Sequence, residues 1–125
     1  MLANATKTFG IILGTENYDA CLSFYRDTLG LPVWYDKGHL CCLRFGDGYL
    51  MIETGGVSSD GVKANAQNPT MLRFNVEDVA MIADQLMSKG VEVDVKTFSW
   101  GQVGTFHDPD GNKCELKNAD DPFFA

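Results

Sequence analysis

The chain repeats one order of predicted elements in its two halves. Residues 9–53 predict a strand, a helix that ends before Gly30, and three short strands, the last of which carries Glu53. Residues 70–115 predict the same order, with Gly90 after the helix and Glu115 on the final strand. Glycine directly after an amphipathic helix is typical of a helix C-terminus. A chain built from two copies of one unit is expected to have a pseudo-twofold axis, with a cleft that both halves share.

Periodicity and turn residues place the elements. Apolar residues at spacings of three and four predict two helices, and short apolar or alternating runs predict eight strands. The predicted helices are 17–29 and 79–87, and the strands are 9–14, 32–35, 39–45, 49–54, 71–76, 91–95, 101–106 and 113–117. The small polar residues of 56–69 indicate a linker, which separates a first unit (1–55) from a second (70–118). In the tail, 119–125, Phe123 and Phe124 either pack on a partner chain or belong to a frayed end.

Charge and cysteine usage exclude several classes of protein. The net charge is −7 and the ten Lys and Arg residues are scattered, so nucleic acid is not an expected partner. An acidic surface suits a cationic ligand, although solubility alone explains it as well. No apolar run reaches the ~18 residues of a membrane span, and the N-terminus lacks the pattern of a signal peptide, so a cytoplasmic location is expected. The four cysteines form no Cys-x-x-Cys pair, which favours buried thiols over a structural zinc site.

Two segments carry a resemblance to a known superfamily. Residues 24–31 read Phe-Tyr-Arg-Asp-Thr-Leu-Gly-Leu, and residues 107–116 read His-Asp-Pro-Asp-Gly-Asn-Lys-Cys-Glu-Leu. Both resemble the vicinal oxygen chelate superfamily, which includes glyoxalase I, bleomycin-resistance proteins, fosfomycin-resistance enzymes and extradiol dioxygenases. The resemblance implies an α+β fold of two βαβββ units, each a curled mixed sheet with a helix on its convex side. It also implies a homodimer.

The resemblance further implies where a metal ion would bind in this chain. Its metal-using members take ligands from the first and last strand of each unit, and these positions fall on Gly10, Glu53, Met71 and Glu115. Glycine has no side chain, and a thioether is a weak ligand for hard or borderline divalent ions. Two carboxylates without an imidazole make a poor site for zinc or nickel. We therefore predict no metal and no cofactor.

Strand alternation separates the residues that face the cleft from those that face the helix. The cleft-facing set and its surroundings supply the candidate ligand-binding residues, and no catalytic residue can be named among them. The candidates are Trp34, Tyr49, Met51, Glu53, Met71, Arg73, Trp100, His107 and Glu115. Arg73 offers a fork for a ligand carboxylate, or it forms an ion pair with Glu53 or Glu115. The two tryptophans either stack on a ligand or pack in the core or a dimer interface. His107 either contacts a ligand or stabilises the turn that follows it.

Three functional hypotheses follow. The first is metal-independent sequestration of a cationic or aromatic small molecule, as in the bleomycin-resistance branch. The second is a metal-dependent glyoxalase-like lyase or isomerase, or a dioxygenase-like enzyme, in which His39 or His107 of a partner subunit adds a donor. The third is a scaffold whose cleft is filled by its own side chains. The first is the leading hypothesis because Gly10 and Met71 stand at two of the four ligand positions.

Overall fold

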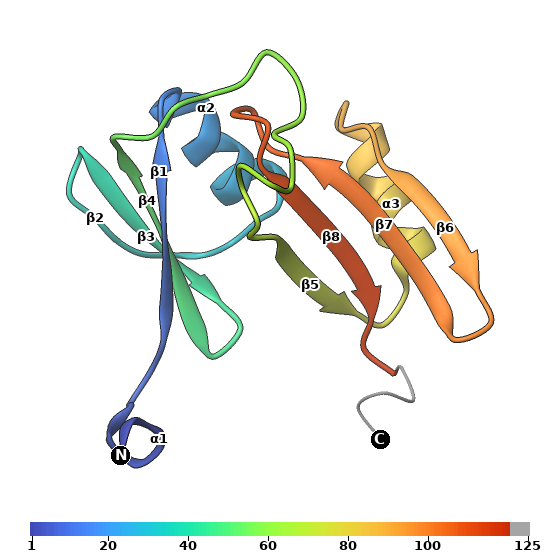
Figure 1. Cartoon of the computed structure of the whole chain (residues 1–125), viewed down its shortest axis with the longest axis horizontal. Helices are drawn as coiled ribbons and strands as arrows, with labels where there is room; N and C mark the ends of the chain where they lie inside the picture. The colour runs from blue at the N-terminus through green and yellow to red at the C-terminus, as the bar shows by residue number, and fades with distance from the viewer. Residues whose placement is uncertain (121–125) are drawn as a thin grey trace. The chain divides into compact units, whose positions relative to one another are not determined.

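The computed structural model describes residues 1–120, so Phe123 and Phe124 lie outside the described residues. The chain divides into two compact units, Met1–Ser58 and Ser59–Ala125, and each is described by itself. Each unit contains a four-stranded mixed sheet and a helix, which confirms the predicted α+β class (Figure 1).

The first unit builds its sheet in the order β1-β4-β3-β2. After a short helix α1 (Leu2–Ala5), its elements are β1 (Gly10–Thr15), α2 (Tyr18–Ser23), η1 (Phe24–Thr28), β2 (Val33–Asp36), β3 (Leu40–Phe45) and β4 (Gly48–Thr54). Strand β1 runs parallel to β4, and the other neighbours are antiparallel. The predicted turn at Gly46 joins β3 to β4, with Phe45 opposite Gly48.

The first helix differs from the continuous amphipathic helix that the spacing predicts. After Ser23 it widens into the π-helical turn η1, in which Leu29 N donates to Phe24 O at 2.8 Å. Single π turns are uncommon in helices. The wider turn accompanies the burial of the adjacent rings of Phe24 and Tyr25, which meet edge to face at 5.2 Å. Gly30 then has φ 76, which confirms the predicted helix end.

The second unit repeats the topology with the sheet order β5-β8-β7-β6. Its elements are β5 (Leu72–Val76), α3 (Val79–Ser88), β6 (Asp94–Phe98), β7 (Gly101–His107) and β8 (Lys113–Asn118). The Asp78 carboxylate caps α3 by accepting from Met81 N at 3.0 Å, and Gly90 with φ 86 follows its end. None of the helices within residues 1–120 is long and apolar enough to cross a membrane.

The predicted strand over 91–95 is wrong in position, because β6 starts at Asp94 and continues to Phe98. Val91 is held by the helix instead: its amide donates to Leu86 O at 3.0 Å. The apolar alternation of 91–95 therefore reflects packing after the helix, and the strand is defined by pairing with β7 from Asp94 onward.

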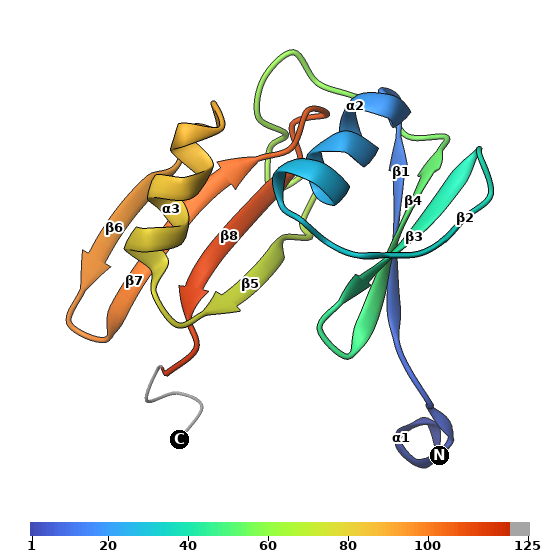
Figure 2. The same ribbon diagram turned by 180° about the vertical axis from the view of Figure 1, so that it is seen from behind.

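Strand alternation is confirmed on the helix-facing side of both sheets. The residues on that side of the central strands are fully or almost fully buried, and α3 lies across this face of the second sheet (Figure 2). They include Cys41, Leu43, Leu50, Ile52, Phe106, Cys114 and Leu116. All four cysteines are buried and reduced, as predicted.

The predicted linker is partly ordered by the turn at 108–112. Ser59 N and Lys63 N donate to the carbonyls of Asp110 and Gly111. The Lys63 ammonium donates to Asn112 Oδ1 at 2.8 Å. Inside the turn, Asp108 Oδ1 accepts from the amides of Asp110 and Asn112. The Asp-Pro-Asp-Gly-Asn segment is thus a buried polar anchor of the second unit.

Candidate functional site

Each sheet has one face opposite its helix, which we call its open face. Pairing registers place four of the predicted residues on or beside the open face of the first sheet and five on or beside that of the second. The first group is Trp34, Tyr49, Met51 and Glu53, and the second is Met71, Arg73, Trp100, His107 and Glu115.

On the first sheet, the ring of Tyr49 covers Gly10. These residues pair across β1 and β4, and a side chain at position 10 would overlap the Tyr49 ring. Glycine at this position therefore lets an aromatic ring lie over the edge strand. Ile12, the next open-face residue of β1, is 59% exposed. The result is an apolar surface at the edge of the sheet.

An irregularity in β2 brings two consecutive aromatic residues to the same region of this face. The β2–β3 register shifts between Val33 and Tyr35, which is a β-bulge. A bulge interrupts the usual alternation, so neighbouring side chains no longer point to opposite faces. The Trp34 ring lies 5.5 Å from that of Tyr35 and 5.7 Å from that of Tyr49. We call Trp34, Tyr35 and Tyr49 the aromatic cluster.

Arg44 lies directly beside the aromatic cluster. It pairs with Tyr49 across β3 and β4, and its guanidinium carbon lies 4.1 Å from the centroid of the Trp34 ring. This distance is within the range of a cation–π contact. The neighbouring Tyr35 hydroxyl is hydrogen-bonded to Cys42, and this contact raises the pKa of Tyr35. Sequence reasoning placed neither Tyr35 nor Arg44 among the candidate site residues.

On the second sheet, Arg73 and Glu115 form an ion pair. They are paired residues of β5 and β8, with Arg73 Nη2 and Nε both 2.6 Å from Glu115 Oε1. The Glu115 side chain is 9% exposed, whereas that of Arg73 is 48% exposed. Of the two interpretations of Arg73, the structure therefore shows the ion pair, with Glu115 as the partner. Met71 precedes β5 and is exposed.

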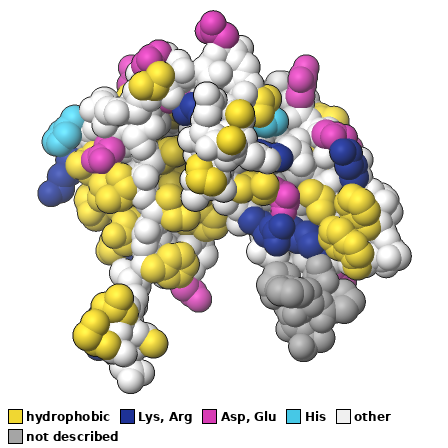
Figure 3. All heavy atoms as spheres, in the orientation of Figure 1, with side chains coloured by type: hydrophobic (Ala, Val, Ile, Leu, Met, Phe, Trp, Pro, Cys, Tyr) yellow, Lys and Arg dark blue, Asp and Glu magenta, His cyan; other side chains and the backbone are white. Residues whose placement is uncertain are grey.

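The ring of Trp100 makes a cation–π contact with a lysine of the same unit. Its ring is stacked on Phe98 at 4.7 Å, and the Lys117 ammonium lies 4.5 Å from the ring centroid. Hydrophobic side chains gather over the β6–β7 hairpin in Figure 3, with basic side chains beside them over β8. Lys117 is almost fully buried, and Trp100 is half-exposed. A cationic ligand at Trp100 would therefore compete with Lys117.

His107 has a buried ring nitrogen with no partner in the part of the chain that the structure describes. It pairs with Lys113 across β7 and β8, and no group of residues 1–120 hydrogen-bonds to its Nε2. Burial and the nearby Lys113 ammonium lower the pKa of His107, while Asp108 opposes this shift. The folded environment thus disfavours the charged imidazole. His39, the other histidine, lies in an exposed turn with Nδ1 3.1 Å from Lys37 O.

The lowered pKa of His107 predicts a stability change with pH. The unfolded chain takes up a proton as pH falls through about 6.5, whereas the folded protein resists it, so folding stability is lost below that pH. We expect His107→Gln to remove this component, so that the wild type loses more stability than the variant between pH 7.5 and 5.5. Urea unfolding at both pH values measures the difference. Equal losses in the two proteins would contradict the assignment.

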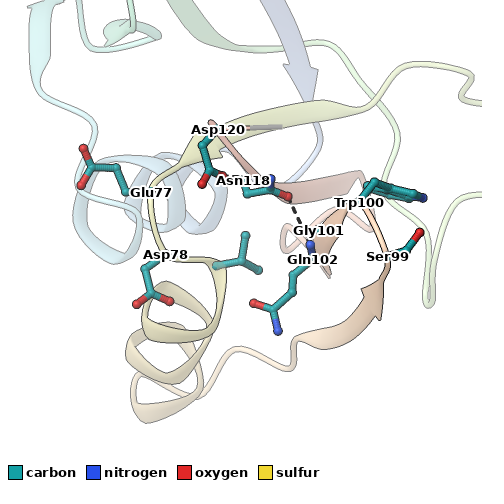
Figure 4. Close-up of a pocket in the computed structure, with 9 residues that line it drawn as sticks. Glu77, Asp78, Ser99, Trp100, Gly101, Gln102, Asn118 and Asp120 are labelled. Atoms are coloured by element: carbon teal, nitrogen blue, oxygen red, sulfur yellow. Dashed lines mark hydrogen bonds between the residues drawn. The ribbon is translucent and has the colours of Figure 1, made fainter. Parts of the chain in front are cut away.

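The second unit also has an open pocket of about 470 Å³ at the start of α3 (Figure 4). Trp100 and three carboxylates, those of Glu77, Asp78 and Asp120, contribute to its lining. Two of the three have structural partners: Asp78 caps α3, and Asp120 accepts from Asn118 Nδ2 at 3.1 Å. The positions of these two carboxylates are therefore explained by hydrogen bonds within the second unit.

The residues present do not fit the metal that the superfamily uses. In the first unit, the residue paired with Gly10 is Tyr49, and Glu53 lies four residues farther along β4. At the usual rise of a strand, Glu53 is about 13 Å along the sheet from the level of Gly10. The Tyr49 ring also occupies the space that a side chain at position 10 would need. In the second unit, Arg73 engages the Glu115 carboxylate, and Met71 offers only a thioether. Each unit thus supplies a single carboxylate at these positions.

Comparison with known proteins agrees with the fold. A family model described as a glyoxalase-like domain matches residues 9–119. The uncharacterized protein YraH of Bacillus subtilis (strain 168) is 30% identical over 123 residues, covering 88% of this chain and 96% of that protein. That relative supports membership in the family without adding an activity.

Two solved structures with different names are equally similar to this chain. A lactoylglutathione lyase from Agrobacterium tumefaciens has 19% identity and a TM-score of 0.69, covering 91% of this chain and 94% of that chain. A bleomycin resistance determinant encoded on the transposon Tn5 has 19% identity and a TM-score of 0.68, covering 92% and 99%. One fold serves both proteins, so a function for this chain must be argued from its own side chains.

Proposed function

We propose a function for this chain from the premise that it belongs to the glyoxalase-like domain family, within the vicinal oxygen chelate superfamily. The proposed function is metal-independent binding of a planar aromatic small molecule, with sequestration as its effect. The binding surface is the open face of the first sheet. The name of the Tn5 resistance determinant is consistent with such a role in this fold.

The aromatic cluster is the observation that carries this proposal. Trp34 is 42% exposed and Tyr35 is 39% exposed, and both are held by a short edge strand rather than by a loop. Large half-exposed rings on a rigid element bury much area on binding and lose little conformational freedom. Ile12 and Met51 extend the same face with apolar surface. A planar aromatic molecule matches this surface in shape and polarity.

The donor chemistry supports a function without a metal. Zinc and nickel favour sites with several donors that include imidazole or thiolate. The superfamily positions of this chain provide Glu53 and an arginine-bound Glu115, with Gly10 and Met71 at the other two. Stacking and apolar contact are the interactions that the open face of the first sheet offers in their place.

Intrinsic fluorescence tests the proposal, because Trp34 and Trp100 are the only tryptophans. We expect an aromatic panel to quench the wild type in a saturable way. Trp34→Leu lacks the fluorophore of this surface, so the affinities of the variants are measured by calorimetry. It is expected to weaken binding by about tenfold, the equivalent of ~1.4 kcal/mol for one lost stacking contact. Trp100→Leu, which removes the tryptophan of the other unit, is the matched control and should leave the affinity within about twofold.

Two results would overturn the proposed function. One is the absence of saturable binding by any aromatic compound in the panel. The other is a stoichiometric site for nickel, zinc, manganese or iron(II) with micromolar or tighter affinity, measured by calorimetry on the purified protein. Such a site would favour a metal-dependent lyase instead.

A further inference from the structure

Arg44 differs from the other two arginines in having no carboxylate partner among the described residues. Arg26 pairs with Asp27 at 2.8 Å, and Arg73 pairs with Glu115 at 2.6 Å. Within residues 1–120, no acidic side chain forms an ion pair with Arg44, and its guanidinium contacts the Trp34 ring instead. Arg44 is exposed. A positioned guanidinium is therefore available on the proposed binding surface.

The fold holds Arg44 in place from two directions. Its amide donates to Pro32 O at 2.8 Å, which ties β3 to the start of β2 beside the bulge. Its guanidinium lies over the ring of Trp34, the residue within that same bulge. Stacking on a ring uses the flat side of a guanidinium and leaves its N–H edge for hydrogen bonds. That edge matches the two oxygens of a carboxylate, sulfate or phosphate.

Charge is distributed unevenly between the open faces and the rest of the chain. Five of the ten basic residues occupy open-face strand positions, against three of the seventeen acidic residues. The five are Arg44, Arg73, Lys96, Lys113 and Lys117, and the three are Glu53, Asp94 and Glu115. The remaining chain holds five basic and fourteen acidic residues. On the first sheet these positions hold one basic residue, Arg44, and one acidic residue, Glu53. Glu53 lies four residues along β4 from Tyr49, the pairing partner of Arg44, so the acidic group of this face is away from the aromatic cluster and the guanidinium is beside it.

Each tryptophan ring already makes a cation–π contact with a basic side chain of the protein. Arg44 lies over Trp34, and Lys117 lies over Trp100. A cationic ligand at either ring would have to displace that side chain and would be repelled by it. The cationic alternative within the sequence-based hypothesis is therefore disfavoured at these rings. An aromatic anion meets both features: its ring packs on the aromatic cluster, and its charge pairs with the guanidinium.

We infer that the ligand of this protein is a planar aromatic anion, whose carboxylate, sulfate or phosphate group is bound by Arg44 while its ring stacks on the aromatic cluster. This inference rests on the proposed function, because it assigns the charge of the molecule bound at the same surface. Arg44 is then the residue that distinguishes anionic from neutral aromatic ligands.

Three probes of one shape test the inference on the full chain: 2-naphthoate, 2-naphthamide and 2-naphthylmethylammonium. We expect 2-naphthoate to bind at least tenfold more tightly than the other two. Arg44→Gln should weaken 2-naphthoate by about tenfold to a hundredfold and 2-naphthamide by less than about threefold. Arg44→Lys, which keeps the charge without the planar fork, should give an intermediate loss for 2-naphthoate. Lys7→Gln, which removes an exposed charge of the same unit, is the matched control and should leave all three affinities unchanged.

The outcomes separate this inference from the proposed function. Binding of none of the probes, or of any wider aromatic panel, would overturn both. Equal affinity for the three probes in the wild type would overturn the inference and leave aromatic binding intact, as would equal losses in Arg44→Gln and Lys7→Gln. Thermal unfolding of each variant shows whether the fold is kept. If Arg44→Gln is unfolded, the comparison of the wild type with Arg44→Lys decides between the same outcomes.

Discussion

Replacing Gly56 with alanine is expected to destabilise the protein by about 3 kcal/mol, the upper end of the usual cost of overpacking. A methyl group at this position would overlap the carbonyl of Gly14 in β1. The methyl group would meet main-chain atoms, which are held in place at this point. The amides of Gly55 and Gly56 both donate to Thr15 O of β1, at 3.1 and 3.2 Å. A strand held in a sheet cannot give way as a flexible side chain does. Urea unfolding with a shared m-value measures the change.

Gly61→Ala is the matched control for this experiment. A methyl group at Gly61 meets no atom within 4 Å, and the backbone there is not in the left-handed region. Its expected effect is within about 1 kcal/mol and in the stabilising direction, since alanine restricts the unfolded chain. Equal effects of the two substitutions would mean that β1 does not approach Gly56 as described.

Arg73→Met is expected to cost about 2 kcal/mol. Removing one partner of a fully buried ion pair costs about 3–5 kcal/mol, because the remaining charge stays buried and unpaired. Here the Glu115 side chain is 9% exposed and that of Arg73 is 48% exposed, so solvent reduces the expected cost. The double variant Arg73→Met with Glu115→Leu removes both charges and should recover most of the loss. Chemical unfolding of the single and double variants gives their coupling energy.

Lys96→Met provides the comparison for this second prediction. It breaks the pair with Asp94, whose atoms are 3.8 Å apart and whose side chains are both more than two-thirds exposed. Exposed pairs of this kind contribute about 0–1 kcal/mol. If Arg73→Met and Lys96→Met have the same small effect, or the double variant recovers nothing, Glu115 does not depend on Arg73 for its burial.

Alternation and turn residues were sufficient to predict much of the fold. The helix-facing residues of the central strands have the burial that a period of two predicts, because one face of each sheet must be covered. The glycines after both helices have the positive φ that helix ends favour. Arg44 could have been found by the same reasoning. The tight turn after Phe45 places it opposite Tyr49, and only its contact with Trp34 required the structure.

The remaining features depend on contacts between distant segments. No local signal in Val33-Trp34-Tyr35 indicates a bulge, because its position is set by pairing with β3. The register between β1 and β4 joins strands that are far apart in sequence, so the ring of Tyr49 over Gly10 was not predictable. The ion-pair partner of Arg73 is similarly decided by the pairing of β5 with β8.

The reactivity of the four buried thiols can measure how readily each unit unfolds locally. Cys21, Cys41 and Cys42 lie in the first unit and Cys114 in the second, and all four have no exposed surface. A thiol reagent can modify them only after the surrounding structure opens, so modification rates follow the opening free energy of each unit. Mass spectrometry of peptides from partly labelled protein would then rank the two units by stability without any introduced probe. Cys42 pairs with Tyr35 and lies two residues before Arg44 on the same face of β3. A bound aromatic anion that slowed labelling of Cys42 would therefore locate its site without a crystal.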